Sequence, residues 1–267
     1  MAKRSFSVTD LPGFATTAIV VFLVLYVPIV TMVIYSFNSG ESPSIFEGFS
    51  LKWYLIAIQN DQVRLATLNS LTIAFAAAVI ATSVATMAAL GTTRRRTFRG
   101  QTMIYVLINQ PLMVPEIVTA VALMLFTAAL KANTGYDGLG YLIAAHSAFC
   151  IPFAYLPIRA RLEGMDMSLE AAATDLYASD WQCFRHVTLP LLMPGIMAGA
   201  MLAFVISLDD VVITEVIKSP GQDTLPTYML GQLRRAVTPE MNAISTVFLA
   251  LSVAVVSLFF FLSRKRN

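Results

Sequence analysis

Three carboxylic acids lie within stretches of sequence that otherwise hold almost no charge. Glu116, Asp209 and Asp210 each fall in a long apolar segment that contains no Lys or Arg. An ionised side chain is costly inside a membrane unless it is paired or faces a water-filled cavity. Because these acids create a negative potential, we predict that they line a pathway for a positively charged solute. The alternative is that they pair with neighbouring side chains or cap broken helices.

Residues that could support covalent or metal chemistry are few and scattered. The chain has two histidines and two cysteines. His146 has no evident nucleophile partner, and a lone His in an apolar helix usually hydrogen-bonds between helices. His186, Cys150 and Cys183 show no metal-ligand spacing or disulfide pattern, and the sequence has no glycine-rich phosphate loop. We therefore predict a protein that is not an enzyme and has no metal site, which disfavours the alternative of an intramembrane enzyme.

The overall composition is that of a membrane protein. Of 267 residues, 57% are hydrophobic and 13% are charged, whereas soluble domains carry about 25% charged residues. Apolar stretches of about 20 residues are long enough to cross a bilayer as helices. The sequence predicts an all-α, polytopic membrane protein with six transmembrane helices in one domain, 1–267. The predicted spans are residues 14–37, 68–90, 103–130, 139–158, 191–217 and 243–262.

Helical geometry gives the three acids different predicted positions. Glu116 lies about 13 residues, or roughly 20 Å, into the third span, near or just past the middle of the membrane. Asp209 and Asp210 lie toward the outer end of the fifth span. Ser207, Asp210 and Thr214 would share one face of that helix, whereas Asp209 points about 100° away from Asp210.

The basic residues predict the orientation of the chain. Twelve of the 18 Lys and Arg residues fall in one set of alternate segments, and short basic loops remain in the cytoplasm. Both termini and the loop at residues 159–190 are therefore predicted to be cytoplasmic. Because the formal net charge is only +2 and the basic residues cluster at span ends, nucleic-acid binding is disfavoured.

The loop at 159–190 holds the longest polar interruption of the sequence. Residues 170–177 are rich in Ala and Leu and predict a short helix. Ser179 or Asp180 can cap a second helix, and Pro190 marks the start of the next apolar segment. The simplest interpretation of such a stretch is a connection between two spans.

This loop resembles the cytoplasmic EAA loop of bacterial ABC-importer permeases, in which Glu-Ala-Ala is followed by a Gly and later by Ile-x-Leu-Pro. Aligning the Leu-Pro pair puts Val187 at the Ile position and Tyr177 at the Gly position. The chain departs from the pattern twice, because Tyr177 replaces Gly and because the Glu falls one position early, at Glu170. The resemblance implies that the loop docks onto a cytosolic ATPase. The residues that it implies for coupling are Glu170, Ala171, Ala172, Ala173, Asp175, Tyr177, Ala178, Leu189 and Pro190.

Over most of its length the chain also resembles the permeases of spermidine/putrescine importers. The segments that carry this resemblance are SLDDVVITEVIKSPGQDTLP from Ser207, VPEIVTAVAL from Val114, GFSLKWY from Gly48, SLTIA from Ser70 and VTPEMNAIST from Val237. It implies a type I ABC-importer permease of MetI-like fold, multi-pass in a bacterial inner membrane. The implied cargo is a polyamine or a related small organic cation, which the carboxylates of Glu116, Asp209 and Asp210 would suit.

The same resemblance implies the partners. These are a second homologous permease, favoured to be a different chain, a cytosolic ATPase dimer and a periplasmic solute-binding protein. ATP and Mg²⁺ would be bound by the ATPase, so this chain would need no cofactor of its own. Relatives in this broad group move other solutes, so an amino acid or a quaternary amine stays open as cargo. An ion-coupled secondary transporter or a channel could use the same acids but would not need a loop that grips an ATPase.

Overall fold

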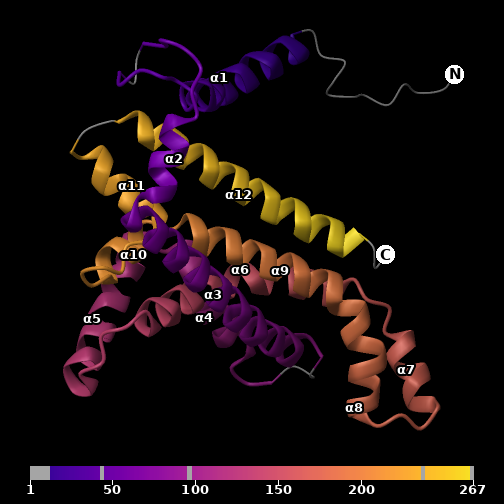
Figure 1. Ribbon diagram of the computed structural model, residues 1–267. Coiled ribbons are helices and arrows are strands. Elements are labelled where there is room, and N and C mark those ends of the chain that lie inside the picture. The colour runs from indigo at the N-terminus through magenta and orange to yellow at the C-terminus, as the bar shows by residue number, and fades with distance from the viewer. Residues whose placement is uncertain (1–12, 43–44, 95–97, 236–237, 265–267) are drawn as a thin grey trace, which may run out of the picture. The chain divides into compact units, whose positions relative to one another are not determined.

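The computed structural model describes residues 13–42, 45–94, 98–235 and 238–264, and every long element in these ranges is a helix (Figure 1). Within them, strand-like pairing is limited to an isolated β-bridge between Asn38 and Phe49. Six helices are long and apolar enough to cross a membrane, as the sequence predicts. The helix bounds are α1 Phe14–Tyr35, α2 Lys52–Gln59, α3 Asp61–Thr93, α4 Gln101–Met113, α5 Glu116–Thr134, α6 Gly140–Glu163, α7 Ser168–Asp175, α8 Asp180–Cys183, the π-helix η2 Phe184–Thr188, α9 Leu189–Asp209, α10 Val212–Ile217, α11 Leu225–Leu233 and α12 Pro239–Arg264.

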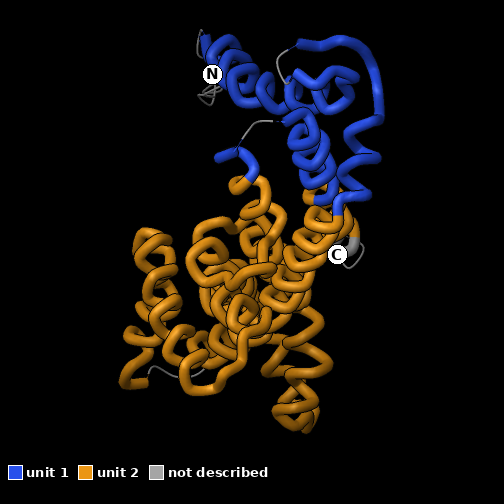
Figure 2. Tube along the Cα trace, turned by 60° about the vertical axis from the view of Figure 1, so that its left-hand side comes forward, with its two compact units in different colours: residues 1–60, 232–251 blue, residues 61–231, 252–267 orange. Residues whose placement is uncertain are grey.

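The chain divides into two compact units, coloured blue and orange in Figure 2. The first unit comprises residues 1–60 and 232–251, and the second comprises residues 61–231 and 252–267. The prediction that the chain forms a single transmembrane domain stays a prediction.

The first unit contains α1, α2 and the N-terminal part of α12. Helix α1 has no charged residue, an 18-residue stretch of it has a mean hydropathy of 2.7, and it buries none of its residues, which suits contact with lipid. The turn after α1 is organised by Asn38, whose side-chain amide donates to the carbonyl of Ile45 at 2.6 Å and accepts from the Glu47 N–H at 2.8 Å. Asn60 at the end of α2 donates to the Glu240 carboxylate of α12 at 3.1 Å.

The core of the second unit is formed by α3, α6 and α9, which pack against one another. Small residues make this close approach possible, as is usual where helices pack in lipid. A Cβ atom added to Gly199 of α9 would lie 2.7 Å from the carbonyl oxygen of Ala154 in α6. The buried face of α3 presents Ala74, Ala77, Ala78, Ala81, Ala85 and Ala89.

The third predicted span, residues 103–130, is wrong as one continuous helix. Helix α4 ends at Met113, Val114 is extended at φ −96° and ψ 138°, and α5 begins at Glu116. Pro115 accounts for the break, because proline disfavours helical geometry in the residue before it and has no N–H to donate. The long apolar helix of this region is therefore α5 alone.

Replacing Gly199 with Ala is expected to lower the thermal stability of the protein. The added methyl group must displace the α6 backbone, and overpacking of this kind typically costs about 1–3 kcal/mol. The measurement is the thermal unfolding midpoint of the purified protein in detergent. Gly231→Ala is the matched control, because nothing lies within 4 Å of a Cβ at that position. Equal loss of stability in both variants would contradict a tight α6–α9 contact.

Candidate functional site

The polypeptide leaves helical geometry at Asp210, between α9 and α10. Asp210 has φ −65° and ψ 132°, and its carboxylate caps the short helix that follows. Its Oδ1 accepts from the Ile213 N–H at 3.2 Å, and its Oδ2 accepts from the Thr214 N–H and hydroxyl, each at 3.0 Å. The alternative interpretation, in which an acid caps a broken helix, thus describes Asp210. The expectation of one continuous fifth span to residue 217 is wrong, since α9 ends at Asp209.

His146 of α6 holds both sides of this break. Its Nδ1 lies 2.8 Å from the Ser207 hydroxyl of α9, and its Nε2 lies 3.0 Å from the Thr214 hydroxyl of α10 and 3.4 Å from Asp210 Oδ2. All four side chains are buried. Ser207, Asp210 and Thr214 therefore meet as expected, although they converge on His146 rather than on one uninterrupted helix. His146 is an interhelical hydrogen-bonding residue, as its isolation in the sequence indicated.

The three predicted acids line one cavity, which we call the acid cavity. Its volume is about 340 Å³, and the residues that line it are Glu116, Val205, Ile206, Asp209, Asp210, Val211 and Val212. Helix α10 packs beside α5, which brings Glu116 to this place (Figure 1). Glu116 is the first residue of α5 and not a residue in mid-helix, so its carboxylate also sits favourably at the positive end of a helix dipole.

The acids of the acid cavity differ in exposure. Asp210 is buried, with 6% of its surface accessible, and its oxygens are engaged by the N–H groups of α10. Asp209 is exposed and Glu116 is half-buried. Two carboxylates are thus accessible from the cavity, and the third shapes its wall.

Glu215, the remaining acid of the predicted fifth span, belongs to a separate ion cluster. Lys218 contacts Glu215 at 2.6 Å and Asp223 at 2.7 Å. Burial alone would lower the pKa of Lys218, but its hydrogen bonds to Asp223 and Glu215 outweigh burial and raise that pKa. This cluster fastens the loop after α10, and its Lys218 is paired with both carboxylates.

Residues 168–190, here called the coupling segment, comprise α7, α8, η2 and the first residues of α9, and α7 and α8 project from one end of the second unit (Figure 1). Glu170 in α7 turns inward, where its Oε1 accepts from the Thr188 hydroxyl at 2.9 Å and lies 3.3 Å from Arg94 Nη2. Ser179 and Gln182 make a capping box at the start of α8, so the predicted cap is Ser179. The other coupling residues named from the sequence lie on the surface or are partly covered, namely Ala171, Ala172, Ala173, Asp175, Tyr177, Ala178, Leu189 and Pro190.

Tyr177 occupies the glycine position of the EAA pattern in a left-handed conformation, at φ 61°. Its side chain is 97% exposed. Left-handed geometry strains residues that carry a Cβ, and glycine adopts it without penalty. The turn between α7 and α8 therefore keeps the backbone shape that the pattern's glycine favours, even though the residue is tyrosine.

No new helix begins at Pro190, where the next apolar segment of the sequence starts. Residues 180–209 run as one helical stretch through η2, and Pro190 is the second residue of α9. A π-turn alters the hydrogen-bond ladder locally, which lets a helix continue past a residue that lacks an N–H.

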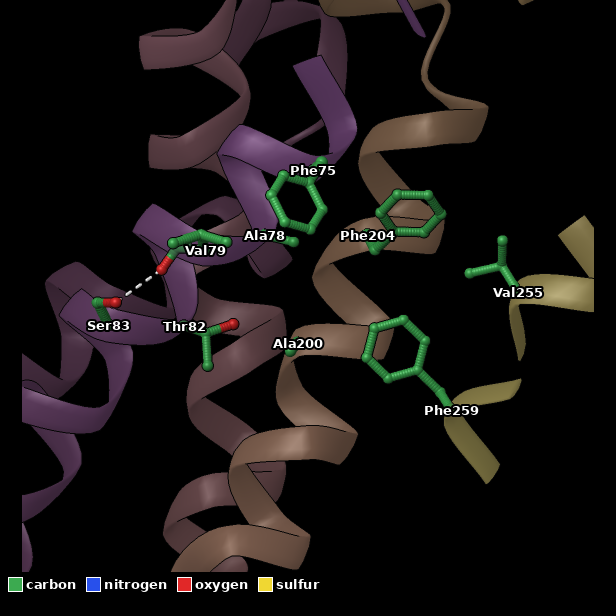
Figure 3. A pocket seen from close by; sticks show the side chains of 9 residues that line it. All are labelled: Phe75, Ala78, Val79, Thr82, Ser83, Ala200, Phe204, Val255 and Phe259. Atoms are coloured by element: carbon green, nitrogen blue, oxygen red, sulfur yellow. Dashed lines mark hydrogen bonds between the residues drawn. The ribbon is translucent and has the colours of Figure 1, made fainter. Parts of the chain in front are cut away.

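A second cavity, an apolar groove of about 460 Å³, lies between α3, α9 and the C-terminal part of α12 (Figure 3). The rings of Phe75, Phe204 and Phe259 border it, and the Thr82 hydroxyl is its one buried polar atom without a hydrogen-bond partner in the described part of the chain. The groove suits hydrocarbon, and it shares no lining residue with the acid cavity. Of these two cavities, the acid cavity is the one that matches a charged solute.

Comparison with known proteins gives the family. Residues 81–266 match the model of the binding-protein-dependent transport system inner membrane component. The chain belongs to this family. It is 38% identical over 231 residues to the putrescine transport system permease protein PotI of Escherichia coli K12, covering 85% of this chain and 82% of that protein. It is 37% identical over 248 residues to the spermidine/putrescine transport system permease protein PotC of Haemophilus influenzae, covering 93% and 95%.

Solved structures agree on the fold. A bacterial ABC transporter involved in the import of alginate matches with a TM-score of 0.72 at 16% identity, covering 93% of each chain. The MetNI methionine ABC transporter matches with a TM-score of 0.67 at 14% identity, covering 82% of this chain and all of that one. The chain is thus a multi-pass inner-membrane transport component and not an enzyme, and its family implies an ATPase and a solute-binding protein as partners.

Two contributors to these sites are not apparent from sequence reasoning. In the sequence, Arg94 is only one of the basic residues that predict the orientation of the chain. In the structure, it contacts Glu170 of the coupling segment. The contact of His146 with Asp210 is likewise absent from the sequence pattern, since the two residues come from different helices. The available signal is a lone His in one apolar segment and acids in another, each of which needs a partner when it is buried.

Replacing His146 with Leu is expected to destabilise the protein by about 1–3 kcal/mol or more, because buried Ser207, Thr214 and Asp210 each lose a partner. Thermal unfolding of the purified protein in detergent measures this loss. His186→Leu is the control, since His186 is exposed. Wild-type stability in the His146 variant would show that Asp210 holds the break without help.

Tyr177→Gly is expected to stabilise the turn of the coupling segment by up to about 1 kcal/mol, because the left-handed strain is removed. The measurement is the rate of proteolytic cleavage within residues 168–190, which should fall. Ala178→Gly is the matched control, since Ala178 has no positive φ and gains only flexibility. Faster cleavage of the Tyr177 variant would contradict the strain.

Proposed function

We propose that this chain is a permease subunit of an ATP-driven importer for polyamines or a related small organic cation. The observation that carries the proposal is the acid cavity, which brings Glu116, Asp209 and Asp210 together at the helix breaks. Its two accessible carboxylates have no Lys or Arg among the residues that line the cavity. A cation with more than one ammonium group is the complementary cargo. The names of the relatives PotI and PotC support the same cargo class.

Within this proposal the acids have separate roles. Asp209 and Glu116 contact the ammonium groups, because their side chains reach the cavity. Asp210 keeps α10 in place through the Ile213 and Thr214 N–H groups and adds negative potential from the wall.

The proposed assembly contains a second permease of similar fold, which is a different chain. An ATPase dimer binds on the cytoplasmic side, and a solute-binding protein binds on the periplasmic side. ATP and Mg²⁺ act on the ATPase, and this chain holds no cofactor. Both termini and the coupling segment face the cytoplasm, which the distribution of Lys and Arg supports. ATP-driven closure of the ATPase moves the coupling segment, and the cavity opens alternately outward and inward.

Asp209→Asn is expected to lower uptake of radiolabelled putrescine and spermidine about tenfold in cells that carry the whole transporter, because a charge-assisted hydrogen bond contributes about 1.5–3 kcal/mol. Glu116→Gln should act in the same direction. Asp61→Asn is the control, since it removes an exposed acid at the start of α3, where Asp61 pairs only with Arg64 among the described contacts.

Unlabelled amino acids and quaternary amines as competitors identify the cargo class. Unchanged uptake in both acid variants would remove these acids from the pathway. Competition by a quaternary amine without polyamine uptake would keep the permease and replace the cargo.

A further inference from the structure

The cytoplasmic end of α3 is fixed to the coupling segment by a partly buried ion pair. Arg94, directly after α3, lies 3.3 Å from the Glu170 carboxylate of α7, and both side chains are only 18% exposed. Thr188 of η2 donates to the same carboxylate oxygen at 2.9 Å. Exposed ion pairs contribute little, but removing one member of a buried pair leaves an uncompensated charge.

The surroundings of Arg94 hold this end of α3 in one position. Arg94 Nη2 also lies 3.9 Å from the sulfur of Met165, which follows α6. Two residues earlier, the Thr92 carbonyl accepts from Gln101 at 2.6 Å, and the Thr92 hydroxyl lies 3.0 Å from the hydroxyl of buried Tyr155 in α6. The helix end is therefore tied to α4, α6 and α7 together.

The N-terminal half of α3 is fixed, at Asn69 and Ser70, to the segment between α10 and the first residue of α11. Asn69 donates from its amide to the carbonyl of Asp223 at 3.0 Å and reaches that of Gly221 at 3.5 Å. Ser70 accepts from the Leu225 N–H at 2.7 Å. This loop directly follows α10, whose N-terminus is capped by Asp210 of the acid cavity.

Helix α3 is one uninterrupted helix of 33 residues, and the part of it between Asn69 and Arg94 is about 37 Å long at 1.5 Å per residue. Its alanine face packs closely on α6 and α9, so bending is restricted. A helix of this kind transmits a displacement along its axis without needing a chain of side-chain rearrangements.

We propose that α3 is a strut that links the coupling segment to the acid cavity, and that Arg94 is the positioning residue that fastens its cytoplasmic end through Glu170. This inference rests on the proposed function, since it describes how the motion of the ATPase reaches the cargo site. A displacement of α7 moves α3 through the Arg94–Glu170 pair, and α3 moves residues 221–225 through Asn69 and Ser70.

The first test measures ATP hydrolysis by the assembled transporter in lipid, with and without its loaded binding protein. Arg94→Gln should leave copurification with the ATPase and basal hydrolysis unchanged and lower stimulated hydrolysis by about fivefold or more. Arg99→Gln is the control, because it removes an exposed charge from the same loop. The exchange Arg94→Glu with Glu170→Arg should restore part of the stimulation, which a local folding defect would not allow.

Asn69→Leu tests the far end of the strut. It should lower stimulation as Arg94→Gln does, although Asn69 and Arg94 are about 37 Å apart along the helix axis at 1.5 Å per residue. Normal stimulation in Arg94→Gln overturns the role of Arg94, and normal stimulation in Asn69→Leu overturns the strut.

A distance measurement tests the strut without any cargo. Spin labels at Leu176, which is 82% exposed, and at Pro220, which is also exposed, report on the coupling segment and the loop after α10. The labelled protein carries Cys150→Ser and Cys183→Ser so that no other thiol reacts. In the wild-type background we expect one narrow distribution of distances between the two labels, which is the same with and without trapped ATP. In Arg94→Gln we expect this distribution to broaden or to shift. Equal distances in both backgrounds overturn the inference.

A different outcome concerns only the cargo. If polyamine-loaded binding protein does not stimulate ATP hydrolysis by the wild type, while the distances are as expected, the proposed cargo is overturned and the strut is not.

Discussion

The hydrocarbon core of a bilayer offers no hydrogen-bond partner, so a spanning helix can break only where the protein satisfies the freed backbone groups. The break after α9 meets this condition through Asp210, which accepts from the N–H groups of Ile213 and Thr214. A buried carboxylate needs partners of its own, and His146 lies 3.4 Å from it. His146 also reaches Ser207 on the near side of the break. The position of α10, and with it one wall of the acid cavity, thus depends on this small polar cluster.

The need to satisfy every buried polar group also gives the acids of these two segments different roles. Asp210 is engaged by the helix that it caps, and Glu215 is neutralised by Lys218. Asp209 and Glu116 are left with access to the cavity, and Glu116 is carried there by the second break, at Pro115. Each of the two helix breaks therefore places a carboxylate in the acid cavity, and the two carboxylates come from different segments of the chain.

Most of the architecture follows from hydropathy, because the length of an apolar run reports directly on crossing a membrane. The interruptions are less predictable. Residues 103–130 form one apolar run in the sequence, and hydropathy contains no information on the break at Val114, which only Pro115 indicates. That Glu116, Asp209 and Asp210 line a pathway is predicted from the cost of isolated charges in lipid. That they meet in one cavity is not, because helical geometry alone places Glu116 near the middle of the membrane and the two aspartates toward its outer end. Arg94 could not be assigned, because its contact depends on how α7 folds back onto the end of α3.

The one-residue displacement of the glutamate in the coupling segment changes what that acid can do. Successive residues of a helix point about 100° apart, so Glu170 and Ala171 face different directions. Ala171 is exposed, and a glutamate there would point away from the protein. Glu170 instead turns inward to Arg94 and Thr188. The acid of this chain therefore joins the coupling segment to the end of α3, while the neighbouring Leu176 and Tyr177 are exposed. Sequence similarity at this loop preserves its shape, while the position of the charge decides whether it acts within the subunit or across an interface.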